Sequence, residues 1–211
     1  MKILIGTPVH ELKDYCMEKW LKNVAKLQKE SPADLLIVDN SAGLGYVKKM
    51  TEYCEKFGIN NYKIEHLEID QGELVNKNID EQIHERVARS QEMIRQFVLS
   101  KDYDVWFSWE CDQLIPSDTL LKLLEIMKMG DFMVVNHNCW DKNVPDGLCF
   151  DLGVSLVSRD CLKKYGFLLE FGKDPEPDTL YNAHAWYRSR LKKDRVRFID
   201  VCNIVSPILH I

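Results

Sequence analysis

The sequence has no long apolar run, no Cys-x-x-Cys pair and no excess of positive charge. Without an apolar run of membrane-spanning length we expect no transmembrane helix, and the apolar first residues are too few for a signal peptide. The seven scattered cysteines favour neither a disulfide framework nor a structural zinc site, so we expect a reducing compartment, the cytoplasm. A formal net charge of -5 gives no general attraction to nucleic acid.

Sequence features that define two other enzyme classes are also absent. The first apolar segment is followed by Gly6-Thr7-Pro8-Val9-His10, without the glycine-rich, basic phosphate loop that a sugar nucleotidyltransferase needs. A phosphohydrolase of the Asp-x-Asp kind needs a nucleophilic acid directly after that segment, and none is there. What is present is ordinary for a globular protein: 211 residues, 45% hydrophobic and 29% charged, which we interpret as one domain.

Apolar segments alternate with amphipathic ones along the first half of the chain. This alternation predicts right-handed crossovers and a mainly parallel sheet flanked by helices. We expect the first strand to stop at Thr7-Pro8, because proline cannot donate to a sheet. The predicted strands are Lys2–Gly6, Asp34–Asp39, Tyr62–Ile69, Asp104–Trp109, Asp131–Asn136, Leu152–Val157 and Val196–Val201, and the predicted helices are Glu11–Lys29, Leu44–Phe57, Ile79–Ser100, Ser117–Met127, Arg159–Tyr165 and Thr179–Lys192.

The strand Asp104–Trp109 ends at two acids separated by one residue, Glu110 and Asp112. Residues i and i+2 of a strand point to the same side, and ligands of open α/β sheets bind where strands end. Burying carboxylates without a compensating cation is costly. The pair therefore indicates a metal and phosphate site, and the alternative is a strand-exit loop with two solvated acids.

Several segments, in this order, resemble the GT-A class of nucleotide-sugar-dependent glycosyltransferases: Ile3–Pro8, Leu36–Ser41, Glu85–Arg89, Trp109–Asp112, Leu152–Arg159 and a late His210. The resemblance implies one α/β, Rossmann-like domain, in which residues 1–112 bind the nucleotide and residues 113–211 bind the acceptor. It implies transfer of a sugar from a nucleotide diphosphate donor, with a UDP-sugar expected, to a hydroxyl of a glycan or glycoprotein. A looser likeness is to glycosyltransferase domains of large DNA viruses of algae, which would place the protein in a host cytoplasm.

The resemblance also implies a divalent metal. Asp112 matches the acid that holds Mn2+ or Mg2+ against the donor diphosphate. Glu110 departs from the usual Asp-x-Asp by a longer first acid, so it contacts the metal, the sugar or only water. His210 matches a histidine that often joins the metal shell in this class, and imidazole favours Mn2+ over Mg2+. The alternative for His210 is an exposed terminal histidine.

The nucleotide pocket is expected around the first two strands. By resemblance, Asp39 lies beside the nucleobase or ribose, with Thr7 and Pro8 shaping the same pocket. A carboxylate suits this position because it accepts from an imide N–H or from hydroxyls. Asp39 as a turn-capping acid is the alternative. Arg86 is expected to brace the nucleotide.

The catalytic base for an inverting enzyme is expected in the second half. Asp178 is the first choice, because it precedes a predicted helix much as the catalytic acid of the class does, and Asp151 and Glu176 are its rivals. Asp178 as a plain helix N-cap is the alternative. A retaining enzyme would need none of the three. From a different class, a non-catalytic nucleotide-sugar binding module also fits the sequence, and the sugar nucleotidyltransferase stays a third alternative.

Four further side chains are better explained by structure than by ligand binding. Arg89 lies four residues after Glu85, which is the spacing of an ordinary helical ion pair. Trp140, Trp186 and Tyr181 could stack on sugar rings, but aromatic side chains more often belong to the core.

Overall fold

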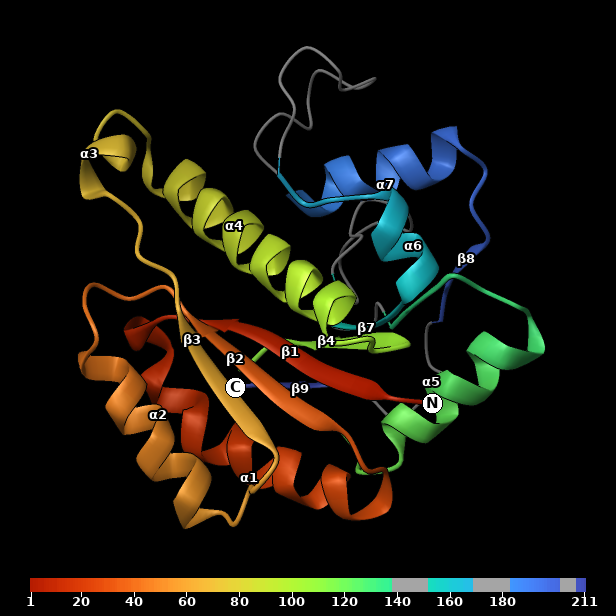
Figure 1. Ribbon diagram of the computed structural model, residues 1–211, viewed down its shortest axis with the longest axis horizontal. Coiled ribbons are helices and arrows are strands. Elements are labelled where there is room, and N and C mark those ends of the chain that lie inside the picture. The colour runs from red at the N-terminus through yellow and green to blue at the C-terminus, as the bar shows by residue number, and fades with distance from the viewer. Residues whose placement is uncertain (138–151, 169–182, 202–207) are drawn as a thin grey trace.

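The computed structural model describes residues 1–137, 152–168, 183–201 and 208–211 of the chain (Figure 1). A seven-stranded sheet has the order β3-β2-β1-β4-β7-β6-β8, and a two-stranded sheet joins β5 to β9. In the large sheet β7 runs antiparallel to both neighbours, and the other pairs are parallel, which confirms the prediction of a mainly parallel sheet. The strands are β1 Ile3–Val9, β2 Asp34–Asp39, β3 Tyr62–His66, β4 Val105–Trp109, β5 Gln113–Leu114, β6 Val134–Asn136, β7 Val154–Ser158, β8 Phe198–Asp200 and β9 Leu209–His210.

Helices cover both faces of the sheet, α1 and α2 on one and α4, α6 and α7 on the other (Figure 1). A 3-10 turn, η1 Glu11–Lys13, leads into α1. The helices are α1 Asp14–Glu30, α2 Gly45–Lys56, α3 Gln71–Leu74, α4 Ile79–Ser100, α5 Thr119–Met129, α6 Arg159–Lys164 and α7 Ala183–Lys193. Every strand and helix predicted in the first half is present, with β2 and α4 at the predicted bounds, whereas α3, β5 and β9 were not predicted.

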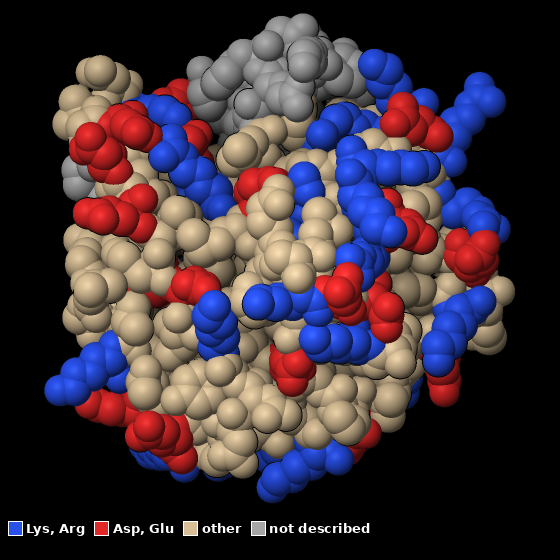
Figure 2. Space-filling view, viewed as in Figure 1, with Lys and Arg blue, Asp and Glu red and all other residues tan. Residues whose placement is uncertain are grey.

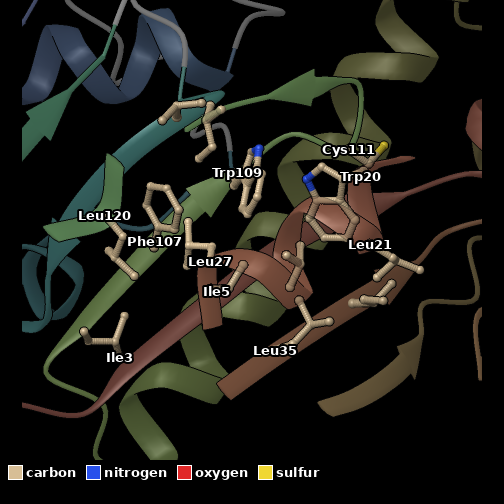
Figure 3. Packing of buried hydrophobic residues seen from close by; sticks show 14 of the residues in the cluster. Ile3, Ile5, Trp20, Leu21, Leu27, Leu35, Phe107, Trp109, Cys111 and Leu120 are labelled. Carbon is tan, nitrogen blue, oxygen red and sulfur yellow. The ribbon is translucent and has the colours of Figure 1, made fainter. Parts of the chain in front are cut away.

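Each face of the sheet has its own hydrophobic cluster. Along β1, Ile3 and Ile5 point to the cluster under α1, α2 and α5, and Leu4 points to the cluster under α4, α6 and α7. In the first cluster Trp20 of α1 meets Trp109 of β4 edge to face, with ring centroids 5.4 Å apart (Figure 3). Because both faces are covered, these strands are apolar at almost every position.

Strand β1 runs through Thr7 and Pro8 to Val9, so the prediction that it stops at Thr7-Pro8 is wrong. Its pairing with β4 ends at Gly6, and its pairing with β2 continues to Val9. The carbonyl of Val9 accepts from the Asn40 N–H at 3.0 Å, so the backbone N–H and C=O of Val9 point toward β2. The backbone groups of Pro8, one residue earlier, therefore point away from β2. The missing N–H of the proline therefore interrupts no hydrogen bond between β1 and a neighbouring strand.

Gly6 is needed because two side chains cross β1 at this residue. A Cβ atom on Gly6 would lie 2.6 Å from both Ile94 Cγ2 and Trp106 Nε1. The indole of Trp106 donates to the Gly6 carbonyl at 3.1 Å. The glycine thus lets α4 and a buried tryptophan of β4 pack directly on the backbone of the central strand.

Candidate functional site

The polar residues of interest lie where β1, β2 and β4 end. The chain passes from β1 to β2 on one side of β1, and β4 then pairs on its other side. Ligands of open α/β sheets bind at such a reversal, beyond the carboxyl ends of the strands, in a region that we call the crevice. The loops that follow these strands supply His10 and Lys13, Asn40 and Ser41, and the acids Glu110 and Asp112.

Asp112 is a buried carboxylate that already has a cation beside it. It is 4% exposed, and its Oδ2 forms an ion pair with the ammonium of Lys13, whose side chain is 44% exposed. Burial opposes the positive charge, but the hydrogen bond and the charge of Asp112 outweigh it and raise the pKa of Lys13 above its ordinary value. Asp112 is therefore not the solvated acid of the strand-exit alternative.

Glu110 is held differently from Asp112. Its Oε2 accepts from the side-chain amide of Gln113 at 2.9 Å, and its N–H donates to the Gly153 carbonyl at 2.7 Å. Gly153 leaves space for that amide, because a Cβ there would collide with Gln113. Strand β4 ends at Trp109, so both acids lie in the turn after the strand and not on the strand itself.

The end of the chain lies beside this acidic turn. In the pairing of β9 with β5, His210 is opposite Gln113, and the Ile211 N–H donates to the Asp112 carbonyl at 2.9 Å. The side chain of His210 is outside what the structure describes, so its role as a metal ligand stays a prediction. Among the described side chains, no three of His, Cys, Asp and Glu form a group that could hold a metal by itself.

Asp39 ends β2 and is fully buried. Its Oδ1 accepts from the Ser41 N–H at 3.0 Å, and its Oδ2 lies 3.1 Å from Nδ1 of His66 at the end of β3. The Ser41 hydroxyl in turn accepts from the Glu11 N–H at 2.8 Å. The carboxylate thus caps the turn after β2, as the alternative reading expected, and it also fixes an imidazole at the mouth of the crevice.

Arg86 and His10 complete this side of the crevice. Arg86 donates from Nη1 to the Asn40 carbonyl at 2.8 Å, which anchors α4 to the loop after β2. Burial, and then the charge of Arg86, lower the pKa of His10. Its Nδ1 accepts from the Leu12 N–H at 3.2 Å, so the neutral ring has its proton on Nε2.

The structure describes four of the remaining predicted residues. Thr7 is fully buried within β1, and Pro8 is partly exposed beside it. Arg89 pairs with Glu85 at 2.6 Å, as its spacing predicted. Trp186 is 2% exposed, which confirms its assignment to the core. The predicted residues that lie outside the described part of the chain are Asp151, Asp178, Glu176, Trp140 and Tyr181.

Sequence reasoning missed Lys13, His10 and His66 as site residues. Lys13 and Asp112 are 99 residues apart in the chain, so nothing local indicates their pairing. His10 and His66 follow or end strands that were predicted, and a polar side chain at the carboxyl end of a parallel strand was a usable signal.

No family model and no curated protein matches the chain. Solved structures do match its fold. A mannosyltransferase from Pyrobaculum calidifontis, in complex with GDP-Man and Mn2+, has a TM-score of 0.67 and 13% identity over 97% of this chain and 55% of its own. TarS from S. aureus has a TM-score of 0.60 and 12% identity over 97% of this chain and 36% of its own. A putative nucleotide-diphospho-sugar transferase from Desulfovibrio desulfuricans G20 has a TM-score of 0.52 and 10% identity, over 96% of this chain and 80% of its own.

These likenesses establish the fold class. The chain has a GT-A-like α/β fold, as nucleotide-sugar glycosyltransferases do, in a single domain with a mixed, mostly parallel sheet. The chain spans about a third of TarS and just over half of the mannosyltransferase. None of the three structures supports the viral likeness. In the described part of the chain, no helix combines the length and hydrophobicity that a membrane crossing requires.

Proposed function

We propose that the chain is a metal-dependent glycosyltransferase that moves a sugar from a nucleotide diphosphate donor, a UDP-sugar, to an acceptor hydroxyl. The observation that supports this most is that two buried acids, Asp39 and Asp112, lie at the carboxyl ends of β2 and β4, the two strands that flank β1 in a GT-A-like sheet. Burying a carboxylate without a partner is costly, and here Lys13 compensates Asp112 while Ser41 and His66 hold Asp39. When the donor binds, a cation-bound diphosphate would replace or join the partner of Asp112, and the nucleoside would do so for Asp39.

Residues 1–112 would bind the nucleotide. Asp39, which is held by the Ser41 N–H and by His66, would accept from the nucleobase or ribose. Arg86 braces the loop that holds Asp39. His10, neutral and protonated on Nε2, offers one hydrogen-bond donor on the same side of the crevice.

The acidic turn fits a hard divalent cation whose shell is completed by substrate. Mg2+ and related ions are commonly held in phosphate-transfer sites by one or two carboxylates together with substrate phosphates and water. Asp112 and Glu110 provide two carboxylates on one turn, and the backbone of His210 lies next to it. Asp112, joined by His210, would hold Mn2+ or Mg2+, and that cation would neutralise charge on the leaving diphosphate.

Residues 113–211 would bind the acceptor, a glycan or glycoprotein. An inverting transfer needs a carboxylate within hydrogen-bond reach of the attacking hydroxyl. Asp178, with Asp151 as its rival, is proposed for this role on sequence grounds. The relatives support the donor class: the mannosyltransferase structure holds GDP-Man with Mn2+, and a TarS structure holds UDP-GlcNAc.

Thermal shift with nucleoside diphosphates tests the proposal. UDP with Mn2+ should stabilise the fold, by about 2.7 kcal/mol at a hundred times its Kd, whereas UDP or Mn2+ alone should have little effect. A metal-dependent release of UDP from a UDP-sugar should accompany binding. Binding without donor hydrolysis would identify a nucleotide-sugar binding module instead. Equal stabilisation by UDP with and without Mn2+ would contradict the metal site.

A further inference from the structure

A hollow lies at the edge of the sheet opposite the acidic turn. Its volume is about 530 Å³, and it opens at the amino-terminal ends of β6 and β8. Its lining residues are Met133, Lys164, Tyr165, Asp194, Arg195, Val196 and Arg197. Because β6 and β8 run parallel to β4, this edge is far from the strand ends that carry Asp39 and Asp112.

The two segments that supply six of the seven lining residues are basic, although the protein as a whole is acidic. Residues 159–168 and 183–201 include nine Lys and Arg but only three Asp and Glu, a net charge of +6, whereas the whole chain has -5. Blue side chains predominate at the upper right of Figure 2, over α6, α7 and β8. Three of the nine basic residues, Lys164, Arg195 and Arg197, line the hollow itself.

Acids around the hollow are already engaged. Asp194 accepts from the Tyr165 hydroxyl at 2.8 Å, and Asp160 pairs with Lys163 at 2.9 Å. Asp131 pairs with Arg197. Within the described residues, four basic side chains are left without an ion pair: Lys164, Lys192, Lys193 and Arg195.

Arg195 occupies a backbone position that glycine would suit better. Its φ is 52°, in the left-handed region. The Arg195 N–H donates to the Lys192 carbonyl at 3.0 Å and the Val196 N–H to the Leu191 carbonyl at 2.9 Å, the pattern of a Schellman helix end, where glycine is usual. A non-glycine residue in this conformation is costly, and such positions often mark function.

The other two non-glycine residues with positive φ show what is unusual about Arg195. Asp102 and Asp131 follow the ends of α4 and α5, and both have the same left-handed backbone conformation. Asp102 pairs with Arg159 at 2.6 Å, and Asp131 pairs with Arg197. Each aspartate therefore gains an ion pair from its position, whereas Arg195 gains none among the described residues.

We propose that the hollow and its basic rim bind phosphate groups of anionic lipids and dock this domain on a negatively charged membrane surface. The rim suits a surface better than a single small anion, because Lys192 and Lys193 extend the charge beyond the hollow. Met129 is 80% exposed two residues before Asp131, the partner of Arg197, and offers an apolar side chain to the same interface. The donor crevice, at the opposite edge, would face away from the membrane.

Co-sedimentation with vesicles tests the docking. The protein should bind phosphatidylcholine vesicles that contain phosphatidylglycerol, should not bind phosphatidylcholine alone, and should dissociate as salt is raised. In Lys164→Gln/Arg195→Gln, binding should weaken about fivefold for each charge removed. The matched control Lys22→Gln/Lys26→Gln removes two exposed charges from α1 and should bind as the wild type does. No binding to anionic vesicles, or an equal loss in the control, would overturn the proposal.

Arg195→Gly separates docking from folding. Glycine relieves the left-handed conformation, so the Tm should rise while vesicle binding falls about fivefold. A variant that is more stable and still binds as the wild type does would remove Arg195 from the site. Inorganic pyrophosphate provides the second arm: saturable binding of pyrophosphate without vesicle binding would show that the phosphate is soluble and would overturn the membrane docking.

Discussion

Charged side chains are arranged in opposite ways at the carboxyl and amino ends of the sheet strands, which we call the carboxyl edge and the amino edge. At the carboxyl edge the acids are buried and each faces a base, Asp39 facing His66 and Asp112 facing Lys13. At the amino edge the bases are exposed, and within the described residues Lys164 and Arg195 form no ion pair, although Asp194 lines the same hollow. A ligand of the first edge would therefore replace an internal partner, whereas an anion could approach Lys164 and Arg195 directly.

This difference bears on how each edge would respond to its ligand. A cation that binds Asp112 has to compete with the Lys13 ammonium, so its apparent affinity is reduced by that competition. An anion at the amino edge would displace no ion-pair partner of Lys164 or Arg195 among the described residues, so its binding should depend steeply on ionic strength. The two sites are therefore distinguishable by their salt and metal dependence.

The largest expected effect follows from removing the buried charge at the carboxyl edge. Asp112→Asn should abolish the Mn2+-dependent stabilisation by UDP and lower donor turnover by at least about a hundredfold, because the metal loses its anionic ligand. Thermal shift and UDP release measure the two effects. The fold should survive, since Lys13 is half exposed and can turn to water.

Asp39→Asn is the matched control, because it removes the other buried charge of the same crevice. The amide oxygen can still accept from the Ser41 N–H, so the turn is kept. UDP affinity should fall about tenfold, the cost of one hydrogen bond to a charged group, and its dependence on Mn2+ should remain. If Asp112→Asn retained the Mn2+ dependence and Asp39→Asn lost it, the metal would have been assigned to the wrong acid.

Much of the first half of the fold could be predicted from the sequence, because its signals are local. Asp34–Asp39 is an unbroken buried strand, and the amphipathic α4 begins with a capping box, in which Asn78 and Glu81 accept from each other's N–H groups at 2.9 and 3.0 Å. Local signals also place the acids of the site at strand ends. The expectation that a ligand binds at that edge follows from these positions together.

What the sequence could not show depends on contacts between distant segments. The stop predicted at Pro8 was wrong because pairing on one side of β1 ends before pairing on the other does. The pair β5–β9 has two residues in each strand, and Gln113 meets His210 only through the fold. Lys13 beside Asp112 is of the same kind, and so is the difference between the two edges of the sheet.

A smaller effect is expected when the internal cation is removed. Lys13→Gln leaves the buried Asp112 without its ammonium, so the metal-free protein should lose about 1 kcal/mol of stability, less than a fully buried pair would cost. Mn2+ should then bind several-fold more tightly, because its competitor is gone. Titration calorimetry with Mn2+ and urea unfolding check both. Weaker Mn2+ binding in Lys13→Gln would show that the lysine supports the metal.

The pH dependence of that competition has a fixed sign. The pKa of Lys13 is raised in the folded protein, so the ion pair stabilises the fold fully below the ordinary lysine value of about 10.4 and is lost as the pH rises through the folded value. Lys13 would therefore compete with Mn2+ at full strength through the neutral range. A Mn2+ affinity in the wild type that rises between about pH 6 and about pH 8 must have another origin, such as deprotonation of His210.

The smallest effect concerns His10, which lies on the nucleotide side of the same edge. Burial and Arg86 lower the pKa of His10 from the ordinary 6.5, so below about pH 6.5 the unfolded chain binds a proton more readily than the folded protein does. The free energy of unfolding therefore falls as the pH drops below about 6.5. In His10→Asn, whose side-chain oxygen can still accept from the Leu12 N–H, this loss should shrink by less than about 1 kcal/mol, because the half-buried ring is screened by solvent. Urea unfolding at about pH 7 and about pH 5 measures this loss of stability.

His84 on α4, whose pKa is also lowered by burial, provides the control. His84→Asn should flatten the same pH profile of stability and leave UDP affinity unchanged, whereas His10→Asn should change both the profile and the affinity. Equal UDP affinities in the two variants would place His10 outside the nucleotide site.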